Sequence, residues 1–272
     1  MTQVTIQTHH GLQVLMFSHL LAGSVLHGFS LRTGGVSASP YDTLNMGFHV
    51  GDDRQAVREN RRRFAAALGF CPQRVISGQQ IHDAAIVNVT QEECGRGADT
   101  DADALPGTDG LLTGEPGVVL MAHAADCALL FFYEATQNYA GLAHAGWRGA
   151  VAGLAPAMVE KLAERGCRRE AISVALSPAI GPCCYRVGEE VVECVPEKWR
   201  RLVLRKRSQG YFFDLPGLLR LLLLAAGIKE ENLVVANYCT SCHSDKFFSY
   251  RRAGGRTGRM AGMIALPKVR AT

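Results

Sequence analysis

Residues 119–149 have the sequence VLMAHAADCALLFFYEATQNYAGLAHAGWRG, and this stretch decides the fold. Two short apolar runs in it, 128–133 and 139–143, flank a polar turn, which predicts a pair of buried, neighbouring strands. Cys127 precedes the first run and His144 follows the second. If the strands are antiparallel, the turn folds one back on the other, so the thiol and the imidazole meet at one edge of the sheet.

A glycine-bracketed turn, Gly-Trp-Arg-Gly, follows the second strand and carries Arg148. Residues 150–165 then have the apolar periodicity of a helix. Pro156 interrupts this window, so it either kinks the helix or moves its start to about residue 155. This order of strand, turn and helix brings His144 and Arg148 to one opening, where backbone N–H groups favour an anion.

The whole chain is typical of one soluble globular enzyme. No Pro/Ser-rich linker or charge block divides the 272 residues, so we expect a single domain over 1–272. The 47% hydrophobic and 20% charged residues are ordinary values for such an enzyme. The net charge of +4 is small, so it argues neither for nor against a polyanionic partner.

Targeting signals are not evident. No Lys or Arg precedes Arg32, so the early apolar stretch 11–26 lacks a basic secretory n-region. The longest apolar run, 218–228, is interrupted by Arg220 and is shorter than the roughly 20 residues that span a bilayer. We therefore expect a cytoplasmic protein, whose nine cysteines are reduced, catalytic or metal-binding rather than a disulfide framework.

Helices and strands are expected to alternate around the central stretch. Residues 27–51 are rich in Gly, Ser, Thr and Asn and predict a structured loop. The expected helices are 52–68, 187–207 and 215–227, and strand material is expected within 75–89, 111–122, 171–176, 233–236 and 247–250. Asp52 or Asp53 is the expected cap of the first helix.

One histidine stands out before the central stretch. His82 lies in a polar interruption of strand material, among Gln79, Gln80 and Asp83, which a core histidine would not need. Together with Cys127 and His144 it makes a set of one thiolate and two imidazoles. That set suits zinc with a fourth position open to water or substrate, although the spacing by itself follows no regular motif.

Other polar clusters are weaker candidates for a functional site. Asp99, Asp101 and Asp103 lack the Gly and the closing Glu of a calcium loop. The arginines at 61–63 are best explained as a solvated helix face. The basic segment 198–207 is best explained as a solvated surface, because no aromatic platform for nucleic acid accompanies it.

A Cys-x-x-Cys-His segment is formed by Cys239, Cys242 and His243. It matches the attachment pattern of c-type haem, but that chemistry follows export. Cys183-Cys184 has the wrong spacing for the second half of a structural zinc site. The favoured interpretation is a loop with incidental cysteines, with a redox or minor metal role as the alternative.

A series of motifs resembles the laccase-domain, or multicopper polyphenol oxidoreductase, family. The most specific are Ala-Asp-Cys at 125–127 and His-Ala-Gly-Trp-Arg-Gly at 144–149. The others follow in order over nearly the whole chain: HGFSLRTGGVS at 27–37, LNMG at 44–47, VGDD at 50–53, Asn60-Arg61, QQIH at 79–82, AIGP at 179–182, FSYRR at 248–252 and Gly258-Arg259. One departure is Asp83, where the family more often has glycine after the histidine; it bears on the shape of that loop and not on the ligand.

The resemblance implies a layered α/β (α+β) sandwich of mixed β-sheets flanked by helices. It implies a purine nucleoside phosphorylase, acting on adenosine, inosine and methylthioadenosine, that also deaminates adenosine. It further implies a zinc ion on residues that correspond to His82, Cys127 and His144. Zinc can activate water for attack on C6 of adenine.

Further site residues follow as predictions. Cys127, His144 and Arg148 are the expected catalytic residues, and Arg148 or Arg61 can supply the cation that phosphorolysis needs beneath the sugar. The expected polar contacts to ribose or base are Asn45, Gln79 and Asp126. The expected partners are nucleosides and phosphate, and no nucleic acid or membrane is expected. We expect the protein to be a monomer or a weak homodimer.

Three other functions stay open. The family's older name suggests a copper-dependent polyphenol oxidase, and His-Cys-His is also the centre of a blue-copper site, but the nine scattered histidines include no His-x-His pair. A metal-free alternative is a cysteine hydrolase, with Cys127 activated by His144, that cleaves amides in cell-wall precursors. The last is a binding module that uses segment 198–207 as its interaction face.

Overall fold

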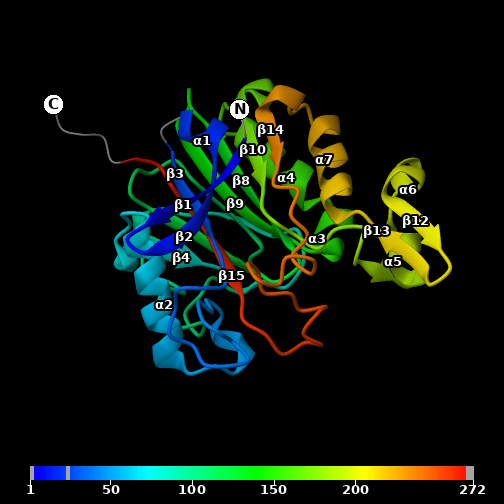
Figure 1. The fold of residues 1–272 in the computed structure, drawn as a ribbon. Helices are drawn as coiled ribbons and strands as arrows, with labels where there is room; N and C mark the ends of the chain where they lie inside the picture. Colours follow the sequence, from blue (N-terminus) through cyan, green and yellow to red (C-terminus); the bar gives the residue numbers. More distant parts are fainter. Residues whose placement is uncertain (1–2, 23–24, 268–272) are drawn as a thin grey trace.

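The core of the protein is a pair of six-stranded sheets, seen in a computed structural model that describes residues 3–22 and 25–267 (Figure 1). The first sheet has the order β1 (Val4–His9), β2 (Leu12–Phe17), β3 (Leu26–Ser30), β15 (Met260–Ala265), β7 (Val119–Ala124) and β4 (Val75–Ser77). The second has the order β14 (Leu233–Val235), β10 (Ser173–Leu176), β8 (Ala128–Glu134), β9 (Tyr139–Ala145), β6 (Gly110–Thr113) and β5 (Ile86–Asn88). Both sheets mix parallel and antiparallel pairs.

The predicted central strands are confirmed as the antiparallel hairpin β8–β9. Leu129 lies opposite His144, and Ala128 lies opposite Ala145. Cys127, one residue before β8, therefore reaches the same sheet edge as His144. The apolar run of β8 is continuous because both of its faces are covered.

Alternate residues of β8 face different layers. Leu129 and Phe131 pack between the two sheets, where Phe131 meets Phe17 of β2 with ring centroids 5.5 Å apart. Leu130 and Phe132 point the opposite way, toward the helices. The hairpin therefore belongs to two cores at once.

Helices cover the outer faces of both sheets (Figure 1). Helix α2 (Arg54–Ala67) packs Phe64 and Ala65 on the first sheet, and the side chain of Asp53 caps its first turn. On the second sheet lie α4 (Leu154–Ala163) and α7 (Leu215–Ala225). The order helix, sheet, sheet, helix confirms the expected layered α/β sandwich.

The helix expected over 150–165 is divided in two. Helix α3 (Trp147–Val151) starts at the glycine-bracketed turn, and α4 starts after Gly153, whose φ of 88° a residue with a side chain rarely adopts. Pro156 then falls in the first turn of α4, where its missing N–H costs nothing. The alternative of a later helix start is the one the structure adopts.

The helix expected over 187–207 is confirmed in part: it is two short helices, followed by a strand of a third, small sheet. This sheet has the order β11 (Arg186–Val187), β13 (Gly210–Phe213) and β12 (Leu204–Arg207), and it lies with α5 (Glu189–Cys194) and α6 (Glu197–Val203) at the right of Figure 1. The basic residues of β12 are in a strand because the aromatic segment of β13 gives them a partner across a short turn. Periodicity within 187–207 could not show that partner.

One further expectation was wrong. The strand predicted at 247–250 is a loop whose Phe247 and Phe248 fill the core between the sheets. The loop expected over 27–51 is confirmed from residue 31 onward, where it contains only the short 3-10 turn η1 (Phe48–Val50), and its first residues belong to β3. The structure also has β15, an unpredicted strand that joins β3 to β7 in the first sheet.

Short helical turns complete the described chain. These are α1 (Ser18–Ala22), η2 (Pro72–Arg74), η3 (Gln91–Glu93), η4 (Arg169–Ala171) and η5 (Glu230–Asn232). Within residues 3–22 and 25–267, no helix has the length and apolar character needed to cross a bilayer.

Candidate metal centre and cavity

His82, Cys127 and His144 come together as predicted. One ligand atom from each lies within 4.8 Å of the other two. They arrive from three elements: the loop between β4 and β5, the residue before β8, and β9. The two imidazole rings meet edge to face, with centroids 4.9 Å apart.

Asp109, a buried carboxylate that the sequence analysis missed, orients the centre. Its Oδ1 accepts a hydrogen bond from His144 Nδ1 at 2.9 Å, which leaves Nε2 of His144 as the ligand atom. Asp109 directly precedes β6, and β6 pairs with β9 so that Gly110 lies opposite Ala143. The sequence signal is an acidic residue directly before a short apolar strand.

The same carboxylate shapes the loop of His82. The backbone N–H groups of Ile81, His82 and Asp83 all donate to Asp109, at 3.1, 3.1 and 3.0 Å. The left-handed residue in this loop is His82, with φ of 64°, and not Asp83. The aspartate found where the family more often has glycine is therefore compatible with the loop.

The thiol and the imidazole stabilise each other's charged forms. Burial alone would raise the pKa of Cys127, but the charge of His144 and hydrogen bonds from both imidazoles lower it to about 6. Burial would lower the pKa of His144, but the Cys127 thiolate and Asp109 raise it to about 9. The surroundings of the two residues therefore favour a thiolate–imidazolium pair in the metal-free protein.

This donor set fits a transition metal. Two imidazoles and one thiolate leave one tetrahedral position free, which is the pattern of a catalytic rather than a structural zinc site, and the same donors also bind copper. A thiolate ligand must be deprotonated, and the surroundings of Cys127 already favour that form. His144 is 3% exposed whereas His82 is exposed, so the centre opens to solvent on one side only.

A cavity of about 650 Å³ adjoins the centre. Its wall includes all three ligand residues, four arginines (Arg61, Arg148, Arg251 and Arg259) and four aromatic residues (Phe48, Trp147, Tyr185 and Tyr250). A volume of this order is typical of sites for small organic molecules. The cations favour an anionic ligand, and the aromatic rings favour a planar one.

Arg61 is buried, which corrects its interpretation as part of a solvated face. It is 7% exposed and donates to the carbonyl oxygens of Met46, Gly97 and Ala98. Its Nη2 also lies 2.9 Å from Nε2 of His123, an imidazole whose pKa is held well below its usual value by burial and by the charge of Arg61. Burial lowers the pKa of Arg61 to about 9, so it is still charged at neutral pH.

Of the other predicted contacts, Arg148, Gln79 and Asp126 line the cavity and Asn45 does not. Arg148 is exposed, with its guanidinium 4.5 Å from the centre of the Trp147 ring. Gln79 also lies on the wall, where its amide donates to Asp101 O. Asn45 is fully buried outside the lining, and its side chain accepts from the N–H of Arg259. A contact between Asn45 and substrate stays a prediction.

Asp126 lines the cavity from a strained backbone position. Its φ is 94°, which is rare for a residue with a side chain and is typical of functional sites. Thr240 Oγ1 donates to its Oδ1 at 2.6 Å, and the N–H of Arg251 donates to its Oδ2 at 2.7 Å. These bonds hold the turn that presents Cys127.

The structure also shows the contacts of two weaker candidates, the acidic loop and the Cys-x-x-Cys-His segment. Asp101 and Asp103 serve different partners, Arg54 and the N–H of Gly97, so the acidic loop is held by local bonds. Cys239 and Cys242, by contrast, meet Cys183 and Cys184 in space, a pairing that the sequence spacing had argued against.

Comparisons with known proteins point to one family. The sequence model of a family described as multi-copper polyphenol oxidoreductase laccase matches residues 26–267. Purine nucleoside phosphorylase YlmD of Geobacillus stearothermophilus is 45% identical over 250 residues, covering 89% of this chain and 90% of its own. The crystal structure of YlmD from that organism superposes with a TM-score of 0.91 at 40% identity, covering 97% and 99% of the two chains. Adenosine deaminase RL5, from an unknown prokaryotic organism, is 31% identical, covering 91% of this chain and 96% of its own.

Replacing Asp109 tests its role in the centre. We expect Asp109→Asn to weaken metal binding about 10- to 100-fold, because the amide orients His144 less firmly and no longer favours its N–H. Chelator competition measures the affinity. Asp99→Asn, on an exposed neighbouring loop, is the matched control and should bind metal like the wild type. Equal affinities for all three proteins would contradict the role.

Proposed function

This chain belongs to the family of multi-copper polyphenol oxidoreductase laccases, and on that basis we propose that it is a zinc-dependent purine nucleoside phosphorylase. The substrates are adenosine, inosine and methylthioadenosine, and deamination of adenosine is a second activity of the same site. The observation that carries the proposal is the His-Cys-His centre at the edge of a cavity lined by arginines and aromatic rings. The names of two relatives, a purine nucleoside phosphorylase and an adenosine deaminase, support both activities.

Phosphate binding is assigned to Arg148 and Arg259. Arg61 already directs four N–H groups at protein acceptors, and a guanidinium has five. Arg259 directs only Nη1 at the carbonyl oxygens of Thr257 and Gly258, which leaves Nε and Nη2 for a ligand. Arg148 extends from the glycine-bracketed turn at the start of α3. Phosphate oxygens suit such forked cations.

The rest of the cavity suits a nucleoside. Trp147 and Tyr250 line the cavity, and aromatic side chains of this kind can stack on a purine. Burial raises the pKa of Tyr185, so its hydroxyl stays a hydrogen-bond donor at neutral pH. Burial, reinforced by Arg259 and Arg61, lowers the pKa of His49 to about 4, so this imidazole is neutral and can accept a hydrogen bond.

His82, Cys127 and His144 would hold the zinc ion. Zinc bound there supplies Lewis-acid activation of water or of a polar group of the substrate. Asp109 fixes the orientation of His144, and the bonds to Asp126 fix that of Cys127. A copper oxidase has less support, because the groups of three or more metal-ligating side chains within the described residues are only this one and a four-cysteine cluster.

A second candidate has its own observation. Cys127, His144 and Asp109 have the order of a nucleophile, a base and an orienting carboxylate, and the thiol has a lowered pKa. The metal-free protein would then be a cysteine hydrolase. The same thiolate serves either function, so reactivity in the presence of metal separates the two.

Phosphate dependence tests the phosphorylase. The zinc-loaded protein should release hypoxanthine from inosine only when phosphate is present. We expect Arg148→Gln to raise the KM for phosphate about 10- to 100-fold, because a charge-assisted hydrogen bond contributes about 1.5–3 kcal/mol. Arg58→Gln, outside the cavity on α2, is the control and should leave KM unchanged. Release of hypoxanthine at the same rate without phosphate would remove the phosphorylase.

Alkylation across pH tests the hydrolase alternative. In the metal-free protein, labelling of Cys127 by iodoacetamide should fall as pH drops through about 6 and level off above it, because the thiolate is the reactive form. The exposed Cys71, which lies outside both cysteine-containing clusters, is the internal reference for labelling. Zinc should suppress labelling of Cys127 and leave labelling of Cys71 unchanged. Rapid labelling of Cys127 in the zinc-loaded protein would favour the hydrolase.

A further inference from the structure

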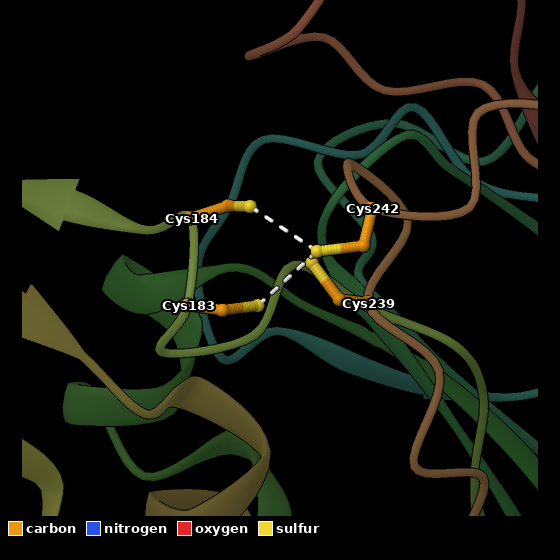
Figure 2. A group of neighbouring side chains, drawn as sticks. All are labelled: Cys183, Cys184, Cys239 and Cys242. Atoms are coloured by element: carbon orange, nitrogen blue, oxygen red, sulfur yellow. Dashed lines mark hydrogen bonds between the residues drawn. The ribbon is translucent and has the colours of Figure 1, made fainter.

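Four cysteines form a second cluster, away from the His-Cys-His centre. Cys183 and Cys184 lie on the loop that follows β10, and Cys239 and Cys242 lie on the loop that follows β14. The two strands are parallel neighbours, so their following loops leave the sheet at the same edge. Figure 2 shows the four side chains pointing toward one another from these two loops.

The sulfur atoms have the spacing of a tetrahedral metal site. Cys242 Sγ lies 3.5 Å from the Sγ atoms of both Cys183 and Cys184, and all four sulfurs lie within 4.8 Å of one another. Four thiolates at about 2.3 Å from zinc would be about 3.8 Å apart. A disulfide needs about 2.05 Å, and all four cysteines are free. We propose that Cys183, Cys184, Cys239 and Cys242 bind a structural zinc ion.

The backbone around the cluster is already organised. Ala179 and Cys239 form a parallel bridge, with Ala179 N–H donating to Tyr238 O and Thr240 N–H donating to Ala179 O. Gly181 N–H donates to Cys239 Sγ at 3.3 Å, the kind of bond that stabilises a ligating thiolate. A Cβ on Gly181 would lie 3.4 Å from Cys183 Sγ, so the backbone of this loop runs directly beside the cluster.

The cluster also braces the active-site cavity. Each of its two loops holds Asp126, through Ile180 N–H to the backbone oxygen at 2.8 Å and through Thr240 Oγ1 to the carboxylate. Asp126 is the strained residue directly before Cys127. A metal that joins the two loops therefore fixes the turn that carries a ligand of the first centre. Cys183 and Cys242 are exposed, which gives the metal a path of entry.

Metal analysis of the full chain tests this site, and its outcome does not depend on the nucleoside activity. Protein purified under reducing conditions with added zinc should hold about two zinc ions per chain by mass spectrometry. Cys239→Ser/Cys242→Ser should hold about one, and so should Cys127→Ser. The control Cys71→Ser/Cys194→Ser removes two exposed cysteines outside the cluster and should still hold about two.

A cobalt spectrum shows which ligands are involved. In Cys127→Ser, every thiolate-to-cobalt charge-transfer band must come from the four-cysteine cluster, and the d–d bands should be those of a tetrahedral ion. Adding Cys239→Ser/Cys242→Ser should abolish these bands. The proposal is overturned if Cys127→Ser binds no metal, if it binds iron in preference to zinc, or if peptide mapping finds the four cysteines in disulfides.

Discussion

The buried carboxylate of Asp109 is the constraint on which the rest of the site depends. It orients the imidazole of His144 and accepts three backbone N–H groups from the loop of His82. Burial by itself would raise the pKa of Asp109, but the hydrogen bonds that it accepts from His144 and from the backbone outweigh this effect and lower the pKa below its usual value. The carboxylate is therefore ionised at neutral pH. One negative charge therefore sets the positions of two ligands that are far apart in sequence.

Sheet pairing brings the remaining ligand into place. Cys127 lies at the edge where β8 begins and β9 ends, so its distance from His144 is fixed by the hairpin register. The turn before it is held from both loops of the four-cysteine cluster through Asp126. The two proposed metal sites are therefore coupled through the backbone, because the loops that carry the four cysteines also hold the strained turn before Cys127.

The sequence predicted the hairpin and its consequence well, because both depend on local patterns. Two apolar runs around one turn leave few alternative pairings, so Cys127 and His144 could be placed together. Asp109 and β15 could not be found in this way, since their roles depend on partners distant in sequence. The same reason explains Cys183 and Cys184, whose spacing fits no motif although they meet Cys239 and Cys242 in space. Arg61 was misjudged because a run of three arginines on a helix hides which one faces inward.

The central claim is that one metal ion binds between His82, Cys127 and His144. The most direct measurement is anomalous diffraction at the zinc edge from crystals of the zinc-loaded protein. The account predicts a peak about 2.0–2.1 Å from a nitrogen of each imidazole and about 2.3 Å from the Cys127 sulfur. No peak between these three side chains, in crystals of protein that still cleaves nucleosides, would contradict it.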